Sequence, residues 1–153
     1  MPRTARSAKR PGSPASIPVS LHVFDAPARD DRGWVLSVAH YDVVQLSRLA
    51  LTDGVQVVRV ESLPPLTYDH DAIIAFAVDA MRSRYRAAPD PAGLLTEPFT
   101  IRELRHVHEA VAGHRLLPDT FRRSMLPGLA QTGETFSEGR GRPAELYRRI
   151  SAG

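Results

Sequence analysis

Residues 99–150 read FTIRELRHVHEAVAGHRLLPDTFRRSMLPGLAQTGETFSEGRGRPAELYRRI, and this stretch decides the fold of the chain. Thr100 and Glu103 have the spacing of a capping box, in which each side chain bonds the backbone of the other residue. Gly113 is typical of a helix end. Between them, one helical face carries Ile101, Leu104, Val107, His108 and Val111. The pattern predicts a helix that ends before Gly113.

A second helix is predicted after residues 116–118, with Asp119 as its N-cap and with Phe121 and Met125 turned inward. Pro127 and Gly128 end it. Residues 129–132 form a short extended run, residues 133–143 form a loop rich in glycine and arginine, and residues 145–150 suit an edge strand. This order of helix, helix, strand, basic loop and strand is that of a winged helix-turn-helix.

The exposed residues of this stretch suit a DNA duplex. A helix that presents arginines near its N-terminus can enter a major groove, where arginine forks onto guanine edges. A glycine-flanked arginine loop can approach a phosphate backbone or a minor groove. Two adjacent arginines on an amphipathic helix are usually just a solvated face, and a glycine-arginine loop alone is about as weak a signal. Together, in this helix-turn-helix order, they favour DNA binding. The candidate DNA-binding residues are Thr120, Arg122, Arg123, Ser124, Arg140 and Arg142.

Three short motifs carry a family resemblance: residues 99–105, residues 121–123 and residues 139–148, which read FTIRELR, FRR and GRGRPAELYR. They resemble the C-terminal DNA-binding domain of the Nudix-related transcriptional regulators, bacterial regulators of NAD and sugar metabolism genes. The match covers about a third of the chain. In that family a basic residue often follows the Phe-Arg-Arg run, whereas this chain has Ser124.

The preceding part of the chain alternates strand and helix patterns. Residues 34–41 predict a strand after a turn at residues 30–33, and residues 55–60 predict a second strand. Asp69 is the predicted N-cap of a helix from about residue 70 to 84. Residues 87–98, with three prolines and a glycine, predict a linker in which Leu94 and Leu95 dock on a neighbouring element.

Two segments of this part, DDRGWVLSVA at residues 30–39 and LTYDH at residues 66–70, are similar to the second half of the Nudix domain in the same regulators. The glutamate-rich Nudix box, which would hold Mg²⁺ against a pyrophosphate, is missing. Residues 102–104 offer only its Arg-Glu-Leu fragment, with His106 and Val107 where glutamates belong. The resemblance therefore implies a partial Nudix-like portion without a catalytic site.

Composition sets wider limits. The 153 residues carry a formal net charge of +3 and no cysteine, which excludes disulfides and cysteine-based metal sites. No apolar run is long enough to span a bilayer, and residues 1–20 lack the apolar core of a secretory signal. Residues 1–20 are instead predicted as a disordered basic tail. The six histidines have no metal-ligand spacing, so we expect no metal. There is no nucleophile elbow and no Gly-rich phosphate loop after a strand, so we also expect no cofactor and no catalytic residue.

These observations predict an α+β chain with a tail at 1–20, a truncated Nudix-like α/β portion at 21–86, a linker at 87–98 and a winged helix DNA-binding domain at 99–153. The leading hypothesis is a cytoplasmic, sequence-specific transcriptional repressor of metabolic genes that is not an enzyme. It would bind double-stranded DNA as a homodimer. The family's effector is an ADP-ribose-like nucleotide. Two alternatives remain: a Nudix-type hydrolase of nucleoside diphosphate derivatives, or an inactive truncated remnant.

Overall fold

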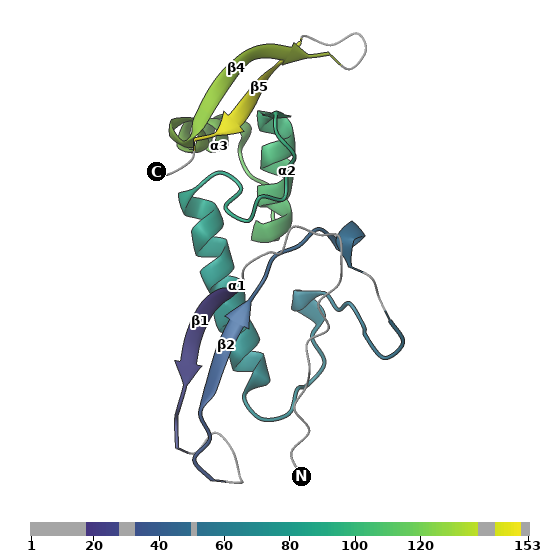
Figure 1. Ribbon diagram of the computed structural model, residues 1–153, viewed down its shortest axis with the longest axis vertical. Coiled ribbons are helices and arrows are strands. Elements are labelled where there is room, and N and C mark those ends of the chain that lie inside the picture. The colour runs from purple at the N-terminus through teal and green to yellow at the C-terminus, as the bar shows by residue number, and fades with distance from the viewer. Residues whose placement is uncertain (1–17, 28–32, 50–51, 138–142, 151–153) are drawn as a thin grey trace.

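The computed structural model describes residues 18–27, 33–49, 52–137 and 143–150 (Figure 1). Most of the predicted tail, residues 1–17, lies outside this described part. Short 3-10 turns occur at Leu46–Arg48, Val60–Ser62 and Leu126–Gly128. The helices and strands are β1 Val19–Phe24, β2 Ser37–Tyr41, α1 His70–Ala87, β3 Phe99–Thr100, α2 Ile101–Ala112, α3 Pro118–Met125, β4 Leu129–Phe136 and β5 Ala144–Arg149.

The C-terminal part is built on one small core between two helices and a three-stranded sheet of order β3-β5-β4. All the strand pairs in it are antiparallel. Residues 145–150 were predicted as an edge strand, and this is wrong: β5 is central, because Phe99 and Thr100 pair with its free side. The buried core consists of Phe99, Leu104, Phe121, Met125, Leu129 and Tyr147.

Helix α2 begins and ends as the sequence predicts. The Thr100 hydroxyl accepts the Glu103 backbone N–H, and the Glu103 carboxylate accepts from the Thr100 N–H at 2.7 Å, which completes the capping box. Gly113 ends the helix with a left-handed φ of 79°. Helix α3, however, begins at Pro118 with Leu117 at the N-cap position, so Asp119 is not its cap. Proline lacks a backbone N–H and has a fixed φ, so it suits the first helical position.

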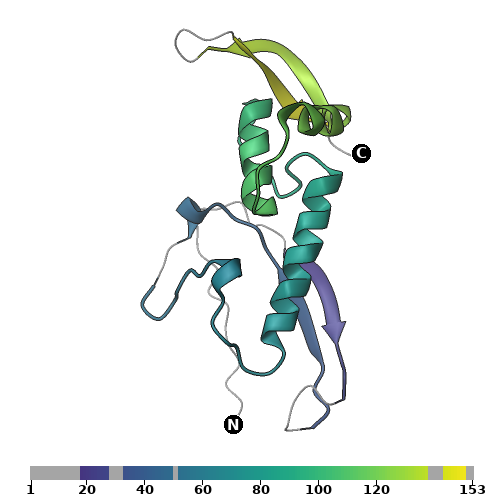
Figure 2. The ribbon, with the colours of Figure 1, turned by 180° about the vertical axis from the view of Figure 1, so that it is seen from behind.

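The N-terminal part pairs β1 with β2 and packs this hairpin against α1, as both ribbon views show (Figures 1 and 2). Phe76 of α1 contacts the rings of His22 and Phe24 at centroid distances of 5.2 and 5.9 Å. Helix α1 was expected to run from about residue 70 to 84, and it continues to Ala87. The side chain of Asp69 makes no capping hydrogen bond.

Three further details of this part differ from the prediction. Val19 and Ser20, expected in the tail, belong to β1. The strand predicted at residues 34–41 begins only at Ser37, because its pairing with β1 ends at Phe24. Residues 55–59 are not a strand, since no strand of the described chain pairs with them and their valines are largely exposed.

The loop after α1 is fixed to the winged part by a buried carboxylate. Asp90 is 1% exposed and accepts hydrogen bonds from the backbone N–H groups of Leu94 and Leu95, at 2.9 and 2.8 Å. It also accepts from the Tyr85 hydroxyl of α1 and from the Arg149 guanidinium of β5, the latter at 2.7 Å. The predicted docking of Leu95 is confirmed, because Leu95 packs against the core. The segment predicted as a linker, residues 87–98, is therefore held to α1 and β5 by hydrogen bonds, and it is called the joint below.

His108 of α2 completes this joint. Its Nε2 accepts the backbone N–H of Asp90 at 3.2 Å, and its ring lies between Tyr85 and Phe121 at 5.0 Å from each. Burial is the largest influence on His108 and lowers its pKa from 6.5 to about 4. The ring is therefore neutral at pH 7, which its role as acceptor requires.

Replacing Asp90 by asparagine should lower the free energy of unfolding by about 2 kcal/mol, because Arg149 would lose one of its two carboxylate partners and a charged hydrogen bond. Asparagine tolerates the positive φ of this position, so the loss would report charge and not backbone strain. Urea denaturation is the measurement, with the exposed Asp79→Asn on α1 as control. A loss no larger than that of the control would contradict the assignment of Asp90 as the joint.

The neutral His108 should make stability depend on pH. Its pKa is depressed on folding, so between pH 6.5 and 4 the unfolded chain binds a proton that the folded chain does not. Stability is therefore full above pH 6.5 and is lost as the pH falls. From pH 7 to 5 the wild type should lose roughly 1–2 kcal/mol more than His108→Gln. Glu97 and Glu109, whose pKa values are lowered, respond only at more acidic pH. Parallel pH curves for the two proteins would refute this.

Candidate nucleic-acid interface

The turn between α2 and α3 sets the direction of α3. The Glu109 carboxylate accepts a hydrogen bond from the backbone N–H of Leu116 at 3.0 Å and another from the Arg105 guanidinium, also at 3.0 Å. Arg105 also donates to the Leu116 carbonyl. The hydrogen bond from Leu116 is the largest of the influences that lower the pKa of Glu109, and Arg105 and Arg115 act in the same direction. A carboxylate that stays charged at neutral pH therefore holds the turn closed.

Helix α3 has one buried and one exposed face. Phe121 and Met125 enter the core with 5% and 4% exposure, which confirms the predicted inward residues. The four predicted residues Thr120, Arg122, Arg123 and Ser124 are all exposed and lie around the rest of the helix surface. Because α3 begins at Pro118 and has eight residues, Arg122 and Arg123 lie in its last turn and not near its N-terminus as predicted. Positive charge there suits the helix dipole.

Arg122 and Arg123 differ in their surroundings. Arg122 donates to Glu145 of β5 at 3.3 Å and to the Tyr147 hydroxyl at 3.5 Å. The Tyr147 hydroxyl itself donates to Glu145. Burial, followed by this hydrogen bond, raises the pKa of Tyr147. Arg123 is exposed, and no hydrogen bond or ion pair joins it to another described residue. The strand thus holds one arginine and leaves the neighbouring one to solvent.

The wing is only partly described. Residues 133–136, predicted as loop, extend β4, which pairs with β5 as far as Phe136 opposite Ala144. Arg140 and Arg142 lie outside the described residues, so the structure does not place them. Arg102 was missed by the sequence analysis. It lies in the first turn of α2 and shares with Arg122, Glu145 and Tyr147 a hollow of about 360 Å³. Only its position at the start of the capped helix could have singled it out.

Taken together, residues 99–150 define a winged helix: two helices joined by a tight turn, followed by a hairpin whose strands support the exposed helix. Residues 91–149 match the family model described as the NrtR DNA-binding winged helix domain. This confirms the resemblance of the C-terminal part to regulatory DNA-binding domains. The matched region begins inside the joint, directly after Asp90.

Other known proteins are similar to this chain over more than its winged helix. The ADPR responsive transcriptional repressor NtrR of Acinetobacter baylyi is 28% identical over 129 residues, which are 78% of this chain and 51% of that protein. The crystal structure of Shewanella oneidensis NrtR superposes with a TM-score of 0.65 at 28% identity, over 87% of this chain and 64% of that one. The same protein complexed with a 27mer DNA gives 0.63 at 29% identity, over 88% and 65%. The chain thus spans about half the length of the curated relative.

Among the described residues, no three histidine or acidic side chains lie close enough together to hold a metal ion. No helix in the same part of the chain is long and apolar enough to cross a membrane.

Removing the carboxylate of Glu145 should release Arg122. In Glu145→Gln we expect the order parameter of the Arg122 Nε–H group to fall below about 0.6, the range of flexible groups. The Arg123 value should not change, because Arg123 has no such contact. NMR relaxation of the arginine side chains is the measurement. Glu134→Gln, an exposed change on β4, is the matched control. An Arg122 side chain equally ordered in both variants would show that Glu145 does not hold it.

Proposed function

We propose that this chain is a sequence-specific DNA-binding transcriptional regulator, which reads a duplex with α3 and contacts its backbone with the β4–β5 wing. One observation carries the proposal. Two exposed arginines, Arg122 and Arg123, stand on α3, a helix fixed by a buried core. In a winged helix, such an exposed helix is the element that enters a major groove. The similar Shewanella protein crystallised with DNA supports it.

We further propose that the chain acts as a repressor of metabolic genes and as a homodimer, so that two α3 helices meet successive major grooves. The part before the winged helix is proposed to be Nudix-like, with an ADP-ribose-like nucleotide as effector. The name of the Acinetobacter relative, which describes a repressor that responds to ADPR, supports the effector. The structural similarity extends over 87% of the chain, well beyond the matched winged helix, and supports the proposed kinship of the N-terminal part.

A hydrolase is the less favoured alternative. The Arg-Glu-Leu fragment of residues 102–104 lies in the first turn of α2, where the Glu103 carboxylate accepts both the Thr100 N–H and its hydroxyl. The Oε2 atom of this carboxylate is thus committed to the helix cap. The proposal therefore assigns the chain no catalytic residue.

Selection from a library of random duplexes tests the proposal. The purified chain should enrich one sequence motif, and for a homodimer this motif should be a palindrome. The same preparation should not hydrolyse ADP-ribose with Mg²⁺ above a blank reaction. Enrichment of no motif would reject the regulator. Metal-dependent hydrolysis would favour the enzyme, and a non-cooperative thermal melt would favour an inactive remnant.

Two sets of arginines should affect binding differently. Replacing Arg122 or Arg123 by alanine should cost about 1–3 kcal/mol on the selected duplex for whichever reads a base, and should relax the preference at one base pair. Replacing Arg140 or Arg142 should weaken binding to all sequences evenly and reduce the salt dependence by about one unit of slope.

The measurement is binding by each single variant to the selected and to a scrambled duplex across a salt series. Arg84→Ala on α1, away from the proposed interface, is the control. If all four variants lose the same affinity for both duplexes, α3 is not the helix that reads the sequence.

A further inference from the structure

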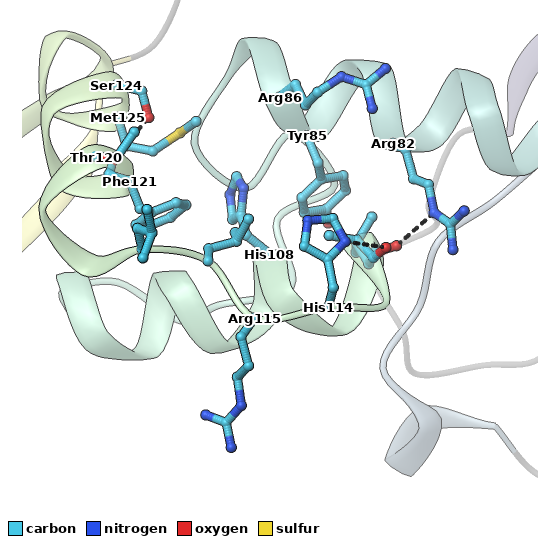
Figure 3. A pocket seen from close by; sticks show the side chains of 14 residues that line it. Arg82, Tyr85, Arg86, His108, His114, Arg115, Thr120, Phe121, Ser124 and Met125 are labelled. Atoms are coloured by element: carbon cyan, nitrogen blue, oxygen red, sulfur yellow. Dashed lines mark hydrogen bonds between the residues drawn. The ribbon is translucent and has the colours of Figure 1, made fainter.

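A hollow of about 410 Å³ opens between α1, the α2–α3 turn and α3 (Figure 3). Its volume lies within the range of pockets that bind small molecules. Of its lining residues, only Thr120 and Ser124 also belong to the proposed DNA contact. Its lining comes from helices α1, α2 and α3 and from the turn between α2 and α3. It includes Tyr85 of α1, Val111 and Ala112 of α2, and Phe121 and Met125 of α3.

The floor of this hollow is aromatic and has no polar group in need of a partner. The rings of Tyr85, His108 and Phe121 follow one another across it, with centroid distances of 5.0 Å. The Tyr85 hydroxyl is bonded to Asp90, and His108 Nε2 accepts from the backbone of Asp90. These rings are only 3–5% exposed, so a ligand that lies over this floor gains by apolar contact area and loses by any polar atom placed there.

The rim of the hollow is positive. Arg82, Arg86 and Arg115 belong to its lining, and the lining contains no carboxylate. Glu61 lies 3.8 Å from Arg82, and Glu109 lies 3.8 Å from Arg115, so both of these charges are partly balanced. Arg86 donates to the Ser83 hydroxyl, and none of the ion pairs between described residues includes it. An apolar floor and a positive rim together favour a ligand with a flat ring and one anionic group.

We propose that this hollow binds a small aromatic carboxylate, with its ring on the floor of Tyr85, His108 and Phe121 and its carboxylate at the arginine rim. The ligand would touch α1 and α3 at once. Thr120 and Ser124, which the proposed function places at the DNA, also line the hollow. Occupancy therefore changes DNA affinity, and DNA changes ligand affinity by the same factor. This second step rests on the proposed function, whereas the binding site itself does not.

The first test uses 2-naphthoate as probe and amide NMR spectra of the full chain. We expect saturable binding with a dissociation constant below about 1 mM, within reach of a small ligand of this size. The shifts should concentrate on Val111, Ala112, Thr120 and Ser124. The neutral 2-naphthalenemethanol should bind about tenfold more weakly, because it lacks the charge. Unsaturable shifts spread over the exposed valines of the N-terminal part would reject the site.

Two variants locate the ligand. Ala112→Phe places a ring in the hollow and should abolish binding of 2-naphthoate. Arg86→Gln should weaken it about tenfold and leave the binding of 2-naphthalenemethanol unchanged. Arg84→Gln, on the same helix but outside the lining, is the matched control for charge. If Ala112→Phe lowers the melting temperature, the test of the site rests on Arg86→Gln alone. Normal binding of 2-naphthoate by Arg86→Gln would then overturn the proposal.

The second test measures affinity for the selected duplex with and without saturating 2-naphthoate. A change of at least threefold, absent in Arg86→Gln at the same probe concentration, is expected. If 2-naphthoate binds and the affinity stays the same, the site exists but is not coupled to DNA. If the chain selects no duplex at all, the proposed function fails while the NMR result for the site stands on its own.

Discussion

The buried carboxylate of Asp90 is the constraint on which the arrangement of the two parts depends. It is fully buried, and its four hydrogen-bond donors come from α1, from its own loop and from β5. A charge so placed is tolerated only when it is paired and fully bonded. Any rotation of α1 against the winged helix would break at least one of these bonds. The joint therefore opposes such a rotation.

This geometry extends from the joint to the exposed helix. His108 accepts from the Asp90 backbone and packs on Phe121, and Phe121 fixes the inner face of α3. Arg149, which pairs with Asp90 and Glu97, belongs to the strand that also carries Glu145, the partner of Arg122. The joint is thus connected to the exposed arginines of α3 in two ways: through the packing of His108 on Phe121, and through strand β5. A change near α1 has a short physical route to α3.

Local signals in the sequence were enough for α2 and for the inner face of α3. The capping box at Thr100 and the glycine at position 113 bounded α2, because both act within a few residues. The inner face of α3 followed from the spacing of Phe121 and Met125. The start of α3 was misplaced because Asp119 and Pro118 both suit a helix N-terminus, and only the structure shows which is used.

Contacts between distant residues could not be predicted in this way. The central place of β5 depends on its pairing with Phe99 and Thr100, about 47 residues earlier. The strand predicted at residues 55–60 has the right alternation, yet no described strand lies beside it. Asp90 looked like an ordinary loop residue, since its partner Arg149 is 59 residues away. Of the predicted site, the four residues on α3 are exposed in the structure, whereas Arg140 and Arg142 lie outside the described residues.

Amide hydrogen exchange at Leu94 and Leu95 tests the central claim most directly, because these two N–H groups bond the Asp90 carboxylate. If Asp90 makes the joint part of the cooperative core, both amides should exchange with the same opening free energy as the amides of α2 around the buried Leu104. Exchange of Leu94 and Leu95 by a low-energy local opening, while α2 stays protected, would contradict the account.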